Sequence, residues 1–420
     1  MNLKFALLSV TCAIAFSACS PAQLVQSRAE RTMDRALNEA VNAMEQSQPT
    51  QTTKIRVATY NTSLYNNEAR GLINRLRGGD ENARKIAAVI QTMRPDVVLL
   101  NEFDYDAKGE AAELFRREYL ARGQYGQTAI EYPYQYFAEV NTGVPSGMDL
   151  DGNGTSGGEG RNAGNDAWGY GLHPGQYGML VLSRYPIDTP NVRTFRMLKW
   201  SAMPQALQPI DPQTNQPYYK PAVWSQLRLS SKSHWDIPIK VGAKTFHFLT
   251  AHPTPPVFDG PEDRNGKRNF DEIRLWREYL NDAAGSRAWL CDDQQRCGGL
   301  NANAAFVIAG DYNADPIDGD GVPGAINQIL AHPRAQQGNV PRSFGAIATA
   351  AAYGYPRKGD VALHTGDFGK NNGTLRLDYV IPSKQFRIDG QGVFWPTSQD
   401  AAAKYANASD HHMVWMDLTF

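Results

Sequence analysis

The chain has 420 residues, of which 42% are hydrophobic and 20% are charged. This is the composition of a globular protein, and the length allows one large domain or two smaller ones with a core that needs no disulfide or metal for support. Basic and acidic residues nearly balance, with a formal net charge of -1. The sequence therefore lacks the global basic excess of a typical nucleic-acid-binding protein, although these totals leave room for a local basic patch.

The N-terminus has the features of an export signal. Residues 1–18 combine a short positive start with an apolar segment at 5–18 that is too short to span a bilayer. Small residues before Cys19 resemble a bacterial lipobox, with Phe16 where leucine is usual. We therefore predict lipidation of Cys19 and a membrane-anchored protein, periplasmic or at the cell surface. The alternative is cleavage after Ala15 and secretion.

Residues 19–53 are predicted to be a tether, and the folded domain is expected to span 54–420. Cys12 leaves with the signal, and Cys19 is the predicted lipid attachment site, so Cys291 and Cys297 remain. An even pair in an exported protein predicts a disulfide, here closing a small loop.

The folded part alternates between strand and helix patterns. Apolar runs predict strands at 55–61, 97–100, 179–183, 244–249, 306–309, 377–381 and 413–420, and helical spacing predicts helices at 82–93 and 272–282. This mixture favours an α/β (α+β) fold, in which two packed sheets carry helices on their outer faces. Polar segments at 141–178 and 200–241 are interpreted as long surface insertions, the second with a strand near 222–229.

Polar residues stand where several of these strands end. They are Asn61, Glu102, His252, Asp311, Asn313, Asp410 and His411. Any one of them could simply cap a turn, but strand ends also present side chains to a shared cleft. Hard oxygen ligands, amides and two histidines suit Mg²⁺, Mn²⁺ or Ca²⁺ together with a phosphate, rather than zinc.

The order of these motifs resembles that of the endonuclease/exonuclease/phosphatase superfamily, which includes deoxyribonuclease I, neutral sphingomyelinases and inositol polyphosphate 5-phosphatases. The matching motifs are Thr-Tyr-Asn at 59–61, Leu-Asn-Glu at 100–102, Ala-His-Pro at 251–253, Gly-Asp-Tyr-Asn at 310–313, Leu-Asp-Tyr at 377–379 and Ser-Asp-His at 409–411. The resemblance covers 54–420 and implies a four-layered α/β sandwich with a divalent-metal-dependent phosphoesterase site.

The resemblance also implies how the metal is held. Glu102 would be its main carboxylate ligand, helped by Asn61 and Asp410, with Mg²⁺ preferred and Mn²⁺ or Ca²⁺ as alternatives. Tyr177 lies near the position where the family places an acid or tyrosine partner for its first histidine, and is a candidate substrate contact.

Catalytic roles follow in the same way. Asp311 would orient or deprotonate the attacking water, Asn313 would bind the phosphate, and His252 would hold a phosphate oxygen or assist the leaving group. His411, oriented by Asp378, would act as general base or phosphate ligand. The adjacent His412 is expected to face the other way.

Three further polar clusters each have two interpretations. Arg264 and Arg268, with Lys267 between them, could recognise an anionic group of the substrate or form a solvated helix start. Asp149, Asp151 and Asn153 could open a calcium-binding loop or form a solvated turn. The acidic run at 315–320 could line the cleft or form a polar turn.

These observations favour an exported, monomeric phosphoesterase acting on a small-molecule or lipid-linked phosphoester. An extracellular nuclease is the alternative, and nucleic acid is the less favoured substrate because the chain shows no basic excess. A non-catalytic surface binding protein is the third hypothesis.

Overall fold

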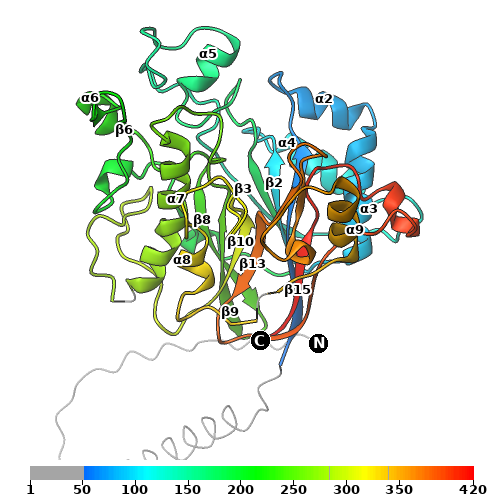
Figure 1. The fold of residues 1–420 in the computed structure, drawn as a ribbon. Helices are drawn as coiled ribbons and strands as arrows, with labels where there is room; N and C mark the ends of the chain where they lie inside the picture. The colour runs from blue at the N-terminus through cyan, green and yellow to red at the C-terminus, as the bar shows by residue number, and fades with distance from the viewer. Residues whose placement is uncertain (1–51, 283, 339) are drawn as a thin grey trace, which may run out of the picture. The chain divides into compact units, whose positions relative to one another are not determined.

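Two mixed β-sheets form the centre of the molecule (Figure 1). The computed structural model describes residues 52–282, 284–338 and 340–420, so the predicted signal peptide, Cys19 and most of the predicted tether lie outside the described residues. The first sheet has the spatial order β14 (Arg387–Val393), β15 (Val414–Thr419), β1 (Lys54–Leu64), β2 (Val97–Phe103), β4 (Met179–Ser183) and β3 (Tyr134–Phe137). The second has the order β13 (Asp378–Pro382), β10 (Ala305–Asp311), β9 (Lys244–Ala251), β8 (His234–Val241) and β5 (Arg193–Thr194).

Strand alternation gives each sheet two apolar faces. In β2, Val97 and Leu99 pack between the sheets, whereas Val98 and Leu100 pack against helices. Because successive side chains of a strand point to opposite faces, a continuous apolar run is buried on both sides. Burial of each such side chain contributes about 1.5–3 kcal/mol to folding.

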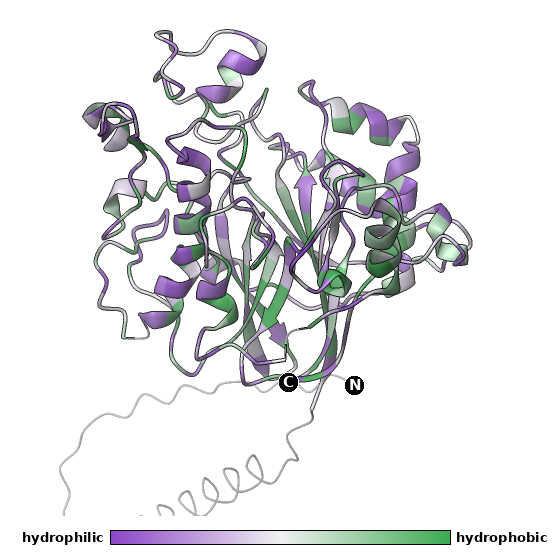
Figure 2. Cartoon of the chain, in the orientation of Figure 1, coloured by the Kyte–Doolittle hydropathy of each residue, from purple (hydrophilic) through white to green (hydrophobic). Residues whose placement is uncertain are grey.

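Helices cover the outer face of each sheet. The first sheet is covered by α2 (Gly71–Arg77), α3 (Glu81–Met93), α4 (Glu110–Leu114) and η1 (Phe115–Leu120), and the second by α7 (Arg264–Asn281) and α8 (Asn327–Leu330). Hydrophobic residues concentrate on the strands in the middle of the molecule, whereas α7 carries hydrophilic residues as well (Figure 2). The predicted four-layered α/β sandwich is confirmed.

The connections contain shorter elements. They are α5 (Gly160–Asn165), η2 (Thr189–Asn191), η3 (Trp200–Ala202), β6 (Ile210–Asp211), β7 (Gln216–Pro217), α6 (Pro221–Trp224), α9 (Phe344–Tyr353), η4 (Val361–Leu363), β11 (Gly366–Asp367), β12 (Thr374–Leu375) and η5 (Ala401–Lys404). In the part of the chain that the structure describes, no helix is long and apolar enough to cross a membrane.

The segment 200–241 differs from its prediction in two respects. The strand predicted near 222–229 is wrong, because α6 occupies 221–224 and Pro221 suits the first turn of a helix. The end of this segment is no insertion, because β8 pairs with β9 along its whole length. The polar His234 and Asp236 of β8 are both buried, which disguised the strand.

The second predicted helix is longer than expected. Its observed counterpart, α7, begins at Arg264, eight residues before the predicted start. The first turns carry the buried polar residues Asn269, Asp271 and Glu272. Their bonding partners lie elsewhere in the fold, so hydrophobic spacing alone could not show that this face is buried.

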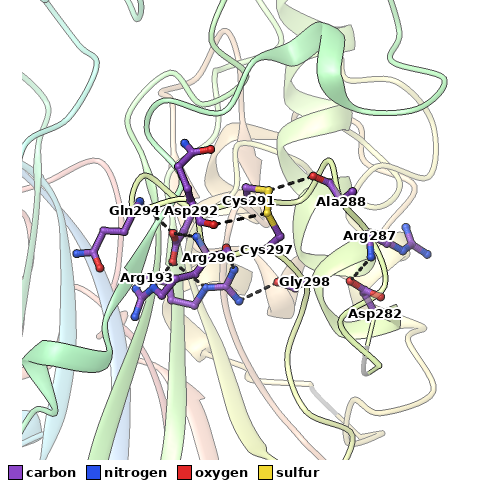
Figure 3. Close-up of a disulfide and its surroundings, with 11 residues drawn as sticks. Arg193, Asp282, Arg287, Ala288, Cys291, Asp292, Gln294, Arg296, Cys297 and Gly298 are labelled. Carbon is purple, nitrogen blue, oxygen red and sulfur yellow. Dashed lines mark hydrogen bonds and ion pairs between the residues drawn. A yellow bond between two sulfur atoms is a disulfide. The ribbon is translucent and has the colours of Figure 1, made fainter.

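Cys291 and Cys297 form the predicted disulfide. Between them Asp292 is buried, and its carboxylate accepts hydrogen bonds from Nε of Arg193 (3.0 Å) and Nε of Arg296 (2.7 Å) (Figure 3). Arg193 belongs to β5, so the small loop is held against the edge of the second sheet.

Candidate active site

The ends of β9 and β10 bring His252 and Asp311 together. These strands run parallel, with Ala309 opposite Thr250. A side chain at Gly310 would place its Cβ 2.0 Å from the carbonyl oxygen of Ala251, so only glycine allows this approach. Gly310 therefore allows β9 and β10 to approach closely at their ends. This brings His252, which follows Ala251, near Asp311, which follows Gly310.

Asp311 is the centre of the site. Its Oδ2 accepts a hydrogen bond from Nδ2 of Asn61 (3.0 Å) and lies 3.5 Å from Nε2 of His252 and 3.7 Å from Nε2 of His411. Asn61 comes from the first sheet and Asp311 from the second, so the site lies where the two sheets meet. Burial, with the charge of Asp378, raises the pKa of Asp311 to about 6, against the opposing effects of His411 and Asn61.

The two imidazoles differ in charge. Burial opposes ionisation of both rings. The carboxylates of Asp378 and Asp311 outweigh burial at His411 and raise its pKa well above 6.5. At His252, burial acts together with the nearby charges of Lys232 and His411, and the pKa falls well below 6.5. The site thus pairs an imidazolium with a neutral imidazole around one carboxylate.

Glu102 lies in β2 with a left-handed backbone, at φ 55°. A glutamate rarely adopts this conformation, and such strain is typical of functional positions. Burial, with the charges of Asp410 and Asp311, raises the pKa of Glu102 to about 7, although His411 and Asn61 oppose the rise. Asp410 is exposed at the rim, where its Oδ1 accepts a hydrogen bond from Oγ of Ser63 (3.1 Å).

The residues present fit a divalent metal. Ligand atoms of Asp311, Asp378 and His411 lie within 4.8 Å of one another, and the carboxylate of Glu102 beside them is hydrogen-bonded by Asn61 and feels the charges of Asp311 and Asp410. Within the described part of the chain, Oδ1 of Asp378 and Nδ1 of His252 are buried without a hydrogen-bond partner. Burial of several carboxylates at one place is unfavourable unless a cation is bound, and their oxygens are the donors that Mg²⁺ prefers.

Asn313 and Tyr177 are the other two predicted residues near the site, and they differ in their contacts. Asn313 is partly exposed, has φ 49°, and donates from Nδ2 to the carbonyl of Pro253 (3.1 Å). Tyr177 packs its ring on Tyr65 with 4.6 Å between centroids, and burial raises its pKa, with smaller contributions from Tyr65 and Glu102. A role of either residue in binding the substrate remains a prediction.

The two arginines in the first turns of α7 are engaged in fold contacts. Arg268 donates to the carbonyl oxygens of Leu229 (2.9 Å), Trp168 (2.6 Å) and Arg228 (2.9 Å). Arg264 forms an ion pair with Glu262. Both guanidinium groups are bonded to other parts of the fold, so the predicted substrate contacts gain no support from the structure.

Two predicted acidic clusters are also internally bonded. Asp149 and Asp151 lie within 4.8 Å of Asp166, which the sequence did not single out, whereas Oδ1 of Asn153 faces Thr155. The carboxylates accept backbone N–H groups of their own loop. The run at 315–320 forms a polar turn whose carboxylates accept backbone N–H groups within the turn and from residues 358, 359 and 376.

Asn101 and Thr365 support the site residues, and His412 lies next to His411. Oδ1 of Asn101 accepts a hydrogen bond from the backbone N–H of Asp311 (3.2 Å), and Oγ1 of Thr365 donates to Oδ2 of Asp378 (2.7 Å). Asn101 belongs to the Leu-Asn-Glu motif, but nothing in the sequence around Thr365 pointed to a role. The adjacent His412 stacks on Trp395, with ring centroids 3.8 Å apart.

Buried carboxylates, an imidazolium and a neutral imidazole around one aspartate are the groups that metal-assisted hydrolysis of a phosphoester requires, and the chain is a metal-dependent hydrolase of phosphoester bonds. A model of the Endonuclease/Exonuclease/phosphatase family matches residues 58–411, and the chain belongs to this family. No curated protein matches it significantly in sequence.

Solved structures of similar fold have low identity to the chain. An endonuclease/exonuclease/phosphatase from Beutenbergia cavernae is 19% identical, with 87% of this chain and 72% of that chain covered and a TM-score of 0.47. Sphingomyelinase C from Streptomyces griseocarneus is 17% identical, with 87% and 99% covered and a TM-score of 0.41. A beta toxin from Staphylococcus aureus with bound magnesium ions is 14% identical, with 87% and 99% covered and a TM-score of 0.39. These likenesses carry no information about the substrate of this chain.

Proposed function

We propose that the chain is an exported phosphoesterase that uses Mg²⁺ to hydrolyse a small-molecule or lipid-linked phosphoester. The observation that carries this proposal is the convergence of His252 and His411 on Oδ2 of Asp311 at 3.5 and 3.7 Å. A carboxylate with its pKa near 6 suits a general base, and an imidazolium suits a proton donor.

Each residue then has one task. The metal, held by Glu102, Asn61 and Asp410, would supply positive charge at the phosphoryl oxygens. Asp311 accepts a proton from the attacking water while the water oxygen bonds to phosphorus.

The bond from phosphorus to the leaving oxygen breaks, and that oxygen takes the pair of electrons together with a proton from His411. Asp311 can return its proton to His411 after the reaction, because the two groups are neighbours. His252, kept neutral by burial, donates a hydrogen bond to a phosphoryl oxygen.

The charge distribution favours a small or lipid-linked substrate over a nucleic acid. A nuclease needs a cationic track for the phosphate backbone, but Arg264 and Arg268 are engaged in fold contacts and the net charge is -1. A cavity of about 560 Å³, lined by Ser63, Ser409 and Asp410 among others, borders the rim of the site and is of a size that suits such a ligand.

A substrate panel tests the proposal. Protein stripped of metal is supplied with Mg²⁺, Mn²⁺ or Ca²⁺ and offered a phosphomonoester, a bis-aryl phosphodiester, sphingomyelin and plasmid DNA. We expect turnover of at least one of the first three, fastest with Mg²⁺. Cleavage of DNA alone would establish the nuclease hypothesis instead, and Asp311→Asn, expected to lose about 10²–10⁴-fold in kcat, controls for contaminating enzymes.

Export is tested separately from catalysis. Membrane and soluble fractions of cells that express the whole chain are compared with those from a Cys19→Ala variant. If Cys19 carries a lipid, the variant leaves the membrane fraction and keeps its specific activity. Equal membrane association of the two proteins would contradict the anchor.

A further inference from the structure

Lys232 is a buried cation beside the site for which the sequence suggested no role. It precedes β8, and only 6% of the residue is exposed. β8 pairs His234 with Ala251, the residue before His252, and the chain bends at Ser231 and Lys232 directly before this strand. Oγ of the adjacent Ser231 donates to the carbonyl of His252 (3.5 Å). The lysine therefore lies at the edge of the sheet where His252 enters the site.

The backbone of this segment is fixed from two sides. Glu272 of α7 accepts N–H groups from both Ser231 and Thr254, each at 2.6 Å. On the other side, the backbone N–H of Asn141 donates to the carbonyl of Lys232 (2.9 Å). A residue held in this way presents its side chain in a defined direction.

The ammonium of Lys232 has charged neighbours but no bonding partner. No hydrogen bond or ion pair of its Nζ occurs among residues 52–282, 284–338 and 340–420. Glu272, Glu102 and Asp311 act on it electrostatically, and its charge in turn acts on His252. Although the residue is largely buried, Nζ is not one of the fully buried atoms that lack a hydrogen bond, so the ammonium keeps an open side and no protein group of these residues competes with a ligand for it.

We propose that Lys232 is a phosphate-binding residue of this site, whose ammonium holds non-bridging oxygens of the scissile group from the side of His252. The inference rests on the proposed function, because it takes the substrate to be a phosphoester. Negative charge spreads over these oxygens in the transition state, and a desolvated cation stabilises it more strongly than a hydrated one would. Lys232 keeps its proton throughout and breaks no bond.

The competing interpretation is that Lys232 only balances the charges of Glu272, Glu102 and Asp311. The two interpretations differ in what Lys232→Met does. A phosphate-binding lysine without a protein partner leaves no broken contact behind, so the variant should melt at the same temperature or higher. A balancing charge would leave repelling carboxylates, and the variant would melt lower.

The decisive measurement is the affinity for inorganic phosphate. We expect Lys232→Met to raise the inhibition constant of phosphate about 10-fold or more and to lower kcat/KM by about 100-fold. Both constants of Lys232→Arg should lie between those of Lys232→Met and those of the wild type. Lys199→Met is the matched control, because Nζ of Lys199 donates to the carbonyl of Gln226 outside the site (3.0 Å), and its constants should stay within a few-fold of wild type.

A second readout separates this proposal from the proposed function. If the wild type turned over no phosphoester, calorimetric titration of phosphate into the Mg²⁺-loaded protein would still compare the two lysine variants. Equal phosphate affinity of Lys232→Met and wild type, with a lower melting temperature of the variant, would overturn the proposal. Weaker phosphate binding with an unchanged or higher melting temperature would support it.

Discussion

Nδ1 of His411 lies 2.8 Å from Oδ2 of Asp378, and both groups are buried. The same carboxylate oxygen also accepts a hydrogen bond from Oγ1 of Thr365 (2.7 Å), which fixes its orientation. Since Asp378 engages Nδ1, it leaves Nε2 of His411 facing Asp311. The pair therefore determines both the charge of the imidazole and the direction in which it can give up a proton.

Asp378→Asn should separate the effect of Asp378 on the charge of His411 from its effect on the orientation of the ring. Loss of the carboxylate charge lowers the pKa of His411, so the protonated form disappears at a lower pH. We expect kcat to fall by about 10²–10⁴-fold and the basic limb of the pH–rate profile to move to lower pH. Measured pH profiles of kcat check this.

A distant histidine controls for loss of fold. His332→Gln removes a buried ring whose Nε2 lies 3.0 Å from Oδ1 of Asn281, at the end of α7 and outside the site. Its activity per folded molecule should stay within a few-fold of wild type. An Asp378→Asn variant with a normal rate and an unshifted profile would remove Asp378 from the mechanism.

Removal of the metal should lower both activity and stability. Metal bound only by the folded state adds about 2.7 kcal/mol to the free energy of unfolding at a concentration 100 times its dissociation constant. Because Glu102 is the proposed main ligand, Glu102→Gln should lose most of this Mg²⁺-dependent rise in melting temperature. Glu113→Gln, which changes an exposed side chain of α4, should keep this rise. Identical shifts in the two variants would exclude Glu102 as a ligand.

The sequence indicated which side chains meet around Asp311, but it did not indicate the buried contacts of the segments next to them. Asn61, His252 and Asp311 follow apolar strands, and strands of a layered fold must end at common edges, so their convergence could be anticipated. The strand β4 was predicted to the residue, because 179–183 is a continuous apolar run.

Other features depend on partners far along the chain. Arg268 could be taken for a substrate contact because its three carbonyl partners lie 39, 40 and 100 positions away. The burial of Lys232 could not be predicted, because it results from the packing of Asn141 and Glu272 around its segment. Neither spacing nor composition contains this information.

The disulfide is expected to contribute stability without affecting catalysis. It closes a loop with a sequence separation of only 6, and the loss of loop entropy in the unfolded chain is correspondingly small, at about 2 kcal/mol. The contacts of Asp292 with Arg193 and Arg296 hold the same loop after reduction. A double Cys291→Ser, Cys297→Ser variant should therefore melt a few degrees lower with unchanged kcat. A large loss of activity without loss of fold would contradict this.

Acid should destabilise the fold through His234. This buried ring donates from Nε2 to the carbonyl of Glu272 (2.8 Å) and accepts at Nδ1 from Oγ of Ser230 (2.6 Å), an arrangement that fits the neutral form. Burial lowers its pKa to about 3, against 6.5 for an ordinary histidine, although the bond to Glu272 opposes the shift. Between these values the unfolded chain binds a proton that the folded chain does not bind, so stability falls as pH decreases.

The size of this effect can be isolated by substitution. His234→Gln keeps a donor for the carbonyl of Glu272 but cannot take up a proton. Between pH 6 and 4, the free energy of unfolding of the wild type should fall more steeply than that of the variant, by about 1.4 kcal/mol per pH unit. Denaturant unfolding at several pH values measures the two slopes. Above pH 7.5 the slopes should coincide, because neither state of the histidine binds a proton there. Parallel curves across the whole range would show that another group carries the acid sensitivity.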